Sequence, residues 1–335
     1  MIQTIKLLSL TFLFTIFISG CSQKVVIKAL EPAEVDRATL TKKISVTNFE
    51  NDTVGLSSKI ESKLISKKID DKSYFTLVSR RDFDKIISEQ KVQNSGLVEV
   101  STAVQIGNLI GAEAIISGRV GRVASSDSSY YETRIRCLDK KCKSVSEYTV
   151  RCTKRTIGLS ADLRMIDIAK GDIIYADTIS KSGEWSHCVD DSRALPSVEI
   201  VSQNLANIIA DEFTTKLTPH YRYFEVTLLD SADGDYTSKD KKLLELSLEY
   251  IKQNRYDKAE KFLIDLIDST NKKSYVALYN LGVVKEAQGQ YDEAREYYKM
   301  ADDLMLDPVE EISEATLRIE KLIIKHNIAS RQLEQ

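Results

Sequence analysis

Four cysteines are the residues whose type and spacing most directly suggest chemistry. They are Cys137, Cys142, Cys152 and Cys188, an even number within one stretch of the chain. Such a set can form two disulfides, stay as free thiols, or bind zinc together with the neighbouring His187. The Cys-x4-Cys spacing is loose for zinc ligands, and an exported protein meets an oxidising compartment. We therefore expect two disulfides and no metal.

Four cysteines allow three connectivities. The four residues Leu138 to Lys141 make a suitable hairpin loop between Cys137 and Cys142, so we predict that these two pair. Cys152 is then left for Cys188. Closing each short loop contributes on the order of 2 kcal/mol in the entropic account of disulfides.

Catalytic groups are scarce in this sequence. The only histidines are His187, His220 and His326, and none has a recognised catalytic spacing. His187 beside Cys188 could be a base beside a thiol, but adjacent side chains rarely point together and a disulfide would remove the nucleophile. The sequence has neither a phosphate-binding Gly-Lys-Ser/Thr loop nor a zinc-protease helix motif. We predict that the protein is not an enzyme and needs no cofactor.

The fifth cysteine, Cys21, ends an export signal. Lys6 precedes a mostly apolar run from Leu7 to Ile18, and small residues lie directly before Cys21. This run is shorter than the roughly 20 residues that a membrane-spanning helix needs, so residues 1–20 are read as a cleaved signal peptide. The site resembles the bacterial lipobox, in which the cysteine carries fatty acids such as palmitate. A free cysteine after an ordinary signal is the alternative. Ser22 stands where an aspartate would resemble an inner-membrane retention signal, which favours the outer membrane.

The charge and hydropathy of the rest exclude several classes of protein. The chain has 47 Lys and Arg residues against 50 Asp and Glu residues, so it offers no basic field for nucleic acid. No second apolar run approaches membrane-spanning length. About 315 residues remain after cleavage, enough for about two domains.

Strands and helices alternate along the first half of the chain. Apolar residues recur at helical spacing around Ile60, Phe83 and Ile106, and β-rich runs lie between these stripes. Two long strands, Thr156 to Ile168 and Asp172 to Ser180, then form a hairpin that is followed by another amphipathic helix. This order predicts an α/β sandwich with a mixed sheet.

The C-terminal part of the chain repeats itself. Asn254-Arg-Tyr-Asp-Lys-Ala259 recurs as Gly289-Gln-Tyr-Asp-Glu-Ala294, at a spacing of 35 residues. Such a period predicts stacked helix pairs, and the pattern resembles the tetratricopeptide repeat. A plain helical hairpin is the alternative. The packing positions that we expect are Leu278, Leu281, Gly282, Ala294, Tyr298 and Ala301 in the second copy, with Tyr250 and Ala259 in the first.

These patterns divide the chain into six parts. The predicted boundaries are 1–20 for the signal peptide, 21–42 for a lipidated tether, 43–220 for the α/β domain with a cysteine-bearing insertion at about 122–156, 221–240 for a linker, 241–326 for the repeats and a capping helix, and 327–335 for a tail. The acidic residues Asp230 to Asp235 lack the ligand spacing of a calcium-binding EF-hand, so the linker is expected to be solvated.

Three ordered stretches carry a family resemblance. They are Val78-Ser-Arg-Arg-Asp-Phe-Asp-Lys-Ile-Ile-Ser-Glu-Gln90, Asn94-Ser-Gly-Leu97, and the segment from Ala103 to Gly118. Together they resemble the curli production assembly/transport (CsgG-like) lipoprotein family. The resemblance implies a periplasmic α/β domain at the outer membrane, within a secretion assembly or an envelope accessory. The repeats at the C-terminus depart from the curli channel itself.

We therefore predict a non-enzymatic adaptor or scaffold for envelope assembly or for secretion of surface proteins, anchored to the outer membrane and facing the periplasm. Its expected partners are other envelope proteins, bound in the groove of the repeats, and the membrane, bound through the lipid on Cys21. A homo-oligomer is left open. The alternatives are an oligomeric CsgG-type secretion channel component and an accessory activator of a peptidoglycan synthase.

In the channel of that family two hairpins line the pore, near residues 122–156 and 180–197 of this chain. Here the apolar stripe of the first is short, and arginines such as Arg134 and Arg151 flank it. An arginine facing lipid near the midplane costs roughly 2–4 kcal/mol. We therefore predict that both segments are water-exposed, disulfide-braced extensions of the sheet that do not span the bilayer.

Overall fold

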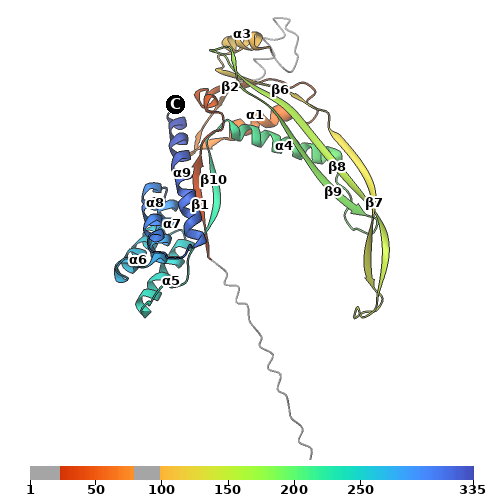
Figure 1. Cartoon of the computed structure of the whole chain (residues 1–335). Helices are drawn as coiled ribbons and strands as arrows, with labels where there is room; N and C mark the ends of the chain where they lie inside the picture. Colours follow the sequence, from red (N-terminus) through yellow and green to blue (C-terminus); the bar gives the residue numbers. More distant parts are fainter. Residues whose placement is uncertain (1–22, 79–98) are drawn as a thin grey trace, which may run out of the picture. The chain divides into compact units, whose positions relative to one another are not determined.

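The computed structural model describes residues 23–78 and 99–335, and these form two compact units (Figure 1). Among the described residues, the α/β unit comprises Leu30–Arg222 and Ile324–Gln335, and the repeat unit comprises Tyr223–Ile323 together with residues 23–29. The signal peptide, Cys21 and the helix expected around Phe83 lie outside the described residues.

A six-stranded mixed sheet forms the centre of the α/β unit. Its strands are β2 (Lys43–Val46), β5 (Thr76–Leu77), β6 (Ala114–Val120), β7 (Ala124–Cys137), β8 (Val145–Asp167) and β9 (Asp172–Cys188). β2 is parallel to β5 and β6, while β8 is antiparallel to β6, β7 and β9. β6 and β7 pair with successive stretches of β8, whose other edge carries β9. A short hairpin, β3 (Lys68–Ile69) and β4 (Lys72–Ser73), lies outside this sheet.

Helices cover both faces of this sheet, as an α/β sandwich requires. α1 (Leu56–Ser66) and α4 (Val198–Lys216) share one buried cluster with Ile44 and Ile116, whereas α3 (Val100–Ile110) shares another with Ile115 and Ile166. Successive residues of a strand point to opposite faces, so Ile115 packs in the cluster of α3 and Ile116 packs in the cluster of α1 and α4. α3 lies close to the sheet: a Cβ added at Gly107 would lie 2.5 Å from Ile168. The predicted sandwich with a mixed sheet is confirmed.

The tether predicted for residues 21–42 is wrong from Lys24 onward. β1 (Lys24–Glu31) pairs with β10 (His220–Thr227), and a 3-10 helix follows at Asp36–Leu40. Val25, Ile27 and Ala29 alternate with the exposed residues Val26 and Lys28, and all three are buried in the repeat unit. In the α/β unit the Arg37 guanidinium binds the carboxylates of Asp167, at 3.3 Å, and Asp172, at 2.6 Å. The alternation was hard to see in the sequence, because the exposed position 26 also carries a valine.

The repeat unit is built from helix pairs. They are α5 (Ser238–Lys252) with α6 (Tyr256–Ser269), and α7 (Tyr275–Ala287) with α8 (Tyr291–Asp302), followed by α9 (Glu310–Glu334). A Cβ added at Gly282 would lie 2.5 Å from the Tyr298 ring, which makes this a close helix crossing. Ala259, Ala294 and Ala301 are fully buried. The predicted all-α repeat module is confirmed.

Two predicted flexible segments are ordered instead. Within 221–240, β10 runs to Thr227 and Thr237 starts α5 with a capping box that includes Asp240. The tail predicted at 327–335 continues α9, because apolar residues keep recurring at helical spacing as far as Ala329, which is fully buried. The Gln332 side chain also accepts a hydrogen bond from the Ala33 N–H at 2.8 Å.

Candidate functional site

Helix α7 of the repeat unit is buried along almost its whole length. Every residue from Val276 to Glu286 is buried. Part of the cover comes from the chain that follows β10. The Tyr279 hydroxyl donates to the Thr227 carbonyl at 2.7 Å, and the Asn280 side chain holds Leu229 at both main-chain groups, accepting from its N–H at 3.1 Å and donating to its carbonyl at 2.7 Å.

Asp233 attaches the later part of this chain segment, which follows β10, to the start of α7. Its carboxylate accepts hydrogen bonds from the Val276 N–H at 3.1 Å, the Ser274 hydroxyl at 3.0 Å and the Tyr236 hydroxyl at 2.7 Å. Burial raises the pKa of the Tyr236 hydroxyl above its usual value, and the hydrogen bond to Asp233 raises it further. Residues 227–236 therefore lie against α7 and are attached to it at Thr227, Leu229 and Asp233.

The chain itself covers part of α7, so the predicted partner groove, which stays a prediction, would use the remaining surface of the repeats. Sequence reasoning missed the three side chains responsible, Tyr279, Asn280 and Asp233. The sequence did contain one indication of this contact. An asparagine lies within an apolar helix, and a buried carboxamide needs hydrogen-bond partners. Between this segment and α5 there remains a cavity of about 410 Å³, lined by Gln23, Asp230, Ala232, Lys241, Leu244, Glu245 and Leu248.

Replacing Asn280 with alanine is expected to lower the free energy of unfolding of the repeat unit by about 1–3 kcal/mol, because it leaves both main-chain groups of Leu229 without their partner. Asn280→Asp should lose at least as much at neutral pH, because it places a carboxylate against the Leu229 carbonyl at a fully buried position. Urea unfolding followed by circular dichroism measures the difference. Gln288→Ala, at an exposed position after α7, is the control. Equal stability of Asn280→Ala and wild type would contradict this account of the occupied surface.

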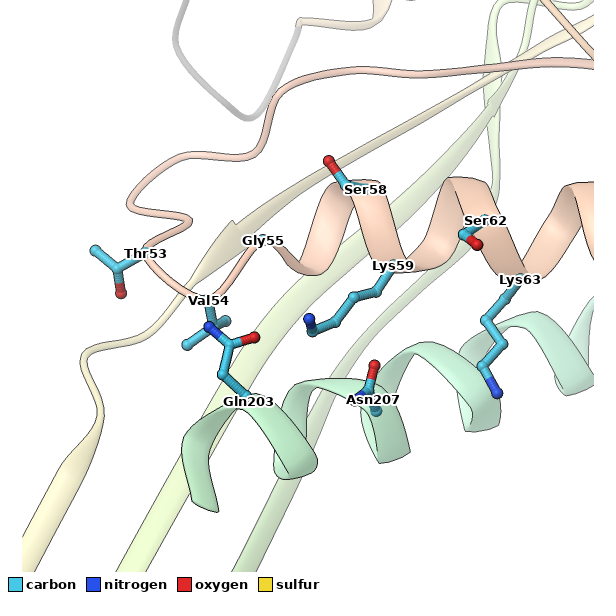
Figure 2. A pocket seen from close by; sticks show the side chains of 9 residues that line it. All are labelled: Thr53, Val54, Gly55, Ser58, Lys59, Ser62, Lys63, Gln203 and Asn207. Atoms are coloured by element: carbon cyan, nitrogen blue, oxygen red, sulfur yellow. The ribbon is translucent and has the colours of Figure 1, made fainter. Parts of the chain in front are cut away.

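A polar groove separates α1 from α4 in the α/β unit (Figure 2). It has a volume of about 460 Å³ and is lined by Thr53, Val54, Gly55, Ser58, Lys59, Ser62, Lys63, Gln203 and Asn207. Figure 2 shows Lys59 and Lys63 extending from α1 toward α4, where the Lys63 ammonium binds Asp211 at 2.9 Å. The Asp52 carboxylate already accepts the N–H groups of Leu56 and Ser57 at the start of α1. This lining offers hydroxyl, amide and ammonium groups, so it suits polar contacts.

The four cysteines form the two disulfides that the loop length led us to expect, Cys137–Cys142 and Cys152–Cys188. Cys152 lies directly opposite Cys188 in the β8–β9 ladder. Glu132 approaches the Cys188 sulfur to 3.6 Å, so three potential metal donors lie close together. Because the disulfide uses both thiols, this group offers no thiolate pair to a metal.

Arg134 joins the two hairpins beside this disulfide. Its guanidinium binds Asp190 at 2.7 Å, Asp191 at 3.0 Å and Glu132 at 3.3 Å. A hydrogen bond from the Cys188 N–H, and then the Arg134 guanidinium, lower the pKa of Asp191. The strand β7 is thereby fixed to the loop that follows β9.

The histidines do not assemble a catalytic set. His187 Nδ1 lies 2.6 Å from the Arg193 carbonyl oxygen, and His220 Nδ1 lies 3.2 Å from that of Thr218. The thiol that His187 would have activated is part of the Cys152–Cys188 disulfide. The pairing of His187 with Cys188 as base and nucleophile is therefore excluded in this state.

Comparison with known proteins agrees with the two units. Residues 26–190 match the family described as "Curli production assembly/transport component CsgG", and residues 275–304 match the tetratricopeptide repeat. The chain thus combines a CsgG-like domain with a tetratricopeptide repeat. The resemblance found in the sequence is confirmed. This family and the repeat indicate association with the cell envelope and a role in protein–protein interaction.

A solved structure also matches the CsgG-like protein. It is the "Crystal Structure of Lipoprotein GNA1162 from Neisseria meningitidis", with 15% identity over 51% of this chain and 99% of that chain, at a TM-score of 0.26. No curated protein matches. Across residues 23–78 and 99–335, none of the helices combines the length and the apolar character needed to cross a membrane.

Proposed function

We propose that this CsgG-like protein is a non-enzymatic adaptor of the bacterial envelope, anchored through a lipid on Cys21 to the outer membrane and facing the periplasm. In this role it brings together envelope proteins that take part in assembly or in secretion of surface proteins. One partner binds the α/β unit and another binds the repeat unit.

The observation that supports this proposal is the division of the chain into two units, each with its own buried core. Helices α5 to α9 enclose one cluster that includes Leu263, Leu281 and Ile319. The sheet, α1 and α4 enclose another that includes Ile116, Leu163 and Phe213. Two such bodies on one chain can hold two partners at a limited separation, which raises the effective concentration of each for the other.

The partner surface of the repeat unit should lie outside the surface of α7 that residues 227–236 occupy. The end of α8 and the loop after it expose Met300, Leu304 and Leu306, with Leu306 fully accessible. Asp302 and Asp303 lie between these residues in the sequence. Exposed apolar side chains with charged neighbours are frequent in protein interfaces, so this is the surface to probe first.

Photo-crosslinking in cells tests the adaptor role. A photoreactive residue is placed at Leu306 in the repeat unit and, in a second strain, at the half-exposed Ile208 on α4. We expect adducts with two different envelope proteins, identified by mass spectrometry, and none at the exposed control position Asp265 on α6. Adducts that contain only a second copy of this chain at both positions would contradict the adaptor role and favour a homo-oligomeric assembly.

A further inference from the structure

The loop that joins β7 to β8, residues 138–144, is held rigid. The Cys137–Cys142 disulfide closes it, and the Leu138 N–H donates to the Ser144 carbonyl at 2.8 Å. Inside the loop the Asp139 carboxylate accepts hydrogen bonds from the N–H groups of Lys141, at 2.9 Å, Lys143, at 3.2 Å, and Ser144, at 2.7 Å. The loop is thus ordered before any partner binds, which lowers the entropic cost of binding.

This rigid loop exposes its cationic side chains. Lys140, Lys141 and Lys143 are all exposed. Within the described part of the chain none of the three ammonium groups has an ion-pair partner at 4.0 Å or less. The carboxylate of Asp139 is the single negative side chain in residues 138–144, and it is engaged by the backbone. The tip therefore carries a concentrated positive charge on a chain whose formal net charge is −3.

Apolar side chains are exposed beside the lysines. Leu138 in the loop is 62% exposed, and Ile135 and Val145 on the adjoining strands are 64% and 54% exposed. Cys137 pairs with Val145 in the β7–β8 ladder, so Ile135, two residues before Cys137, lies on the same face as Val145. Isolated exposed apolar residues need no explanation, but here three of them adjoin three unpaired lysines on one braced hairpin.

We propose that this hairpin tip, Ile135 to Val145, is a contact for a membrane surface that contains anionic lipid. The lysine ammonium groups bind the phosphates of the headgroups, while Leu138, Ile135 and Val145 enter the boundary between headgroups and acyl chains. Such a contact is peripheral and does not require the hairpin to cross the bilayer. It is independent of the adaptor role.

The kind of cation favours lipid over an acidic protein as the partner. Lysine is depleted from protein–protein interfaces, where arginine is enriched because its planar group makes fixed paired hydrogen bonds. Lysine is a point charge on a flexible stem, and this suits a fluid layer of phosphates that offers no fixed geometry. A layer of headgroups also accepts aliphatic side chains without a matching pocket, unlike an acidic protein surface.

Vesicle binding of the full mature chain with Cys21→Ser, which carries no lipid, tests the proposal. The probes are vesicles of phosphatidylcholine with phosphatidylglycerol, and vesicles of phosphatidylcholine alone. We expect binding to the anionic vesicles that falls with salt. The triple variant K140E/K141E/K143E should bind at least about 100-fold more weakly. The control variant K239E/K241E/K242E makes the same charge change on exposed positions of α5 and should bind like wild type.

The apolar part of the contact has its own test. Ile135→Ser with Leu138→Ser should weaken binding about tenfold or more without changing its salt dependence, because each buried aliphatic group contributes to membrane affinity. Near-wild-type circular dichroism and intact disulfides establish that each variant is folded. The proposal is overturned if wild type and the lysine variant bind the anionic vesicles equally, if the serine variant binds as tightly as wild type, or if soluble polyglutamate binds the tip as tightly as the vesicles do.

Discussion

Replacing Glu286 with alanine is expected to lower the free energy of unfolding of the repeat unit by about 3–5 kcal/mol. Glu286 is fully buried on α7. The Arg318 guanidinium on α9 binds it through two hydrogen bonds, of 2.8 and 2.9 Å, and the Tyr298 hydroxyl on α8 donates to the same carboxylate. One side chain therefore joins three helices.

The large effect comes from the groups that the substitution leaves behind. Burial disfavours the charged form of Arg318, but the hydrogen bonds and charge of Glu286 outweigh this and raise its pKa. Burial also raises the pKa of the Tyr298 hydroxyl, which stays protonated and needs an acceptor. Without Glu286 a cation whose side chain is only 20% exposed and a buried hydroxyl lose their partner together, and unpaired charges away from water are costly.

Urea unfolding of the mature chain, followed by circular dichroism, measures this loss. Glu314→Ala, which removes an exposed carboxylate from α9, is the matched control and should change stability by less than about 0.5 kcal/mol. The double variant Glu286→Ala with Arg318→Leu should recover part of the stability, because it removes the orphaned charge. A Glu286→Ala protein as stable as its Glu314→Ala control would show that the buried pair does not hold α9 to α7.

Replacing Cys21 with serine is expected to release the protein from the membrane fraction and to abolish palmitate labelling. A serine cannot form the thioether that carries the diacyl group, and each buried CH2 of an acyl chain contributes about 0.8 kcal/mol to membrane binding. The loss should therefore be close to complete. Fractionation in high salt is the appropriate measurement, because salt suppresses the proposed contact of the lysine tip and leaves acyl anchoring intact.

Ser22→Asp is the matched variant for this experiment. It leaves Cys21 in place, so labelling and membrane association should persist, while the protein should move from the outer to the inner membrane. Membrane association of Cys21→Ser that equals wild type after the salt wash would contradict lipid anchoring. If the Ser22→Asp protein stays in the outer membrane, this would contradict only the proposal that residue 22 determines which membrane the protein reaches.

Several features of this protein were determined by the sequence alone, because each depends on residues that are near one another in the chain. The strand Ala114–Val120 and the hairpin of β8 and β9 follow from β-rich runs bounded by turns. The repeats follow from a fixed period. Cys137 and Cys142 were paired from the length of one loop, and the structure contains that disulfide.

Other features were decided only by the tertiary structure, because their partners lie far along the chain. β1 is a strand because β10 supplies its partner, and Lys24 of β1 binds Glu225 of β10 across 201 positions. Asn280 holds the main chain of Leu229, which lies 51 residues earlier and carries no motif. A main-chain hydrogen bond carries little sequence information, because every residue except proline offers the same N–H and carbonyl groups. The occupied surface of α7 could therefore be found only once the chain had folded onto itself.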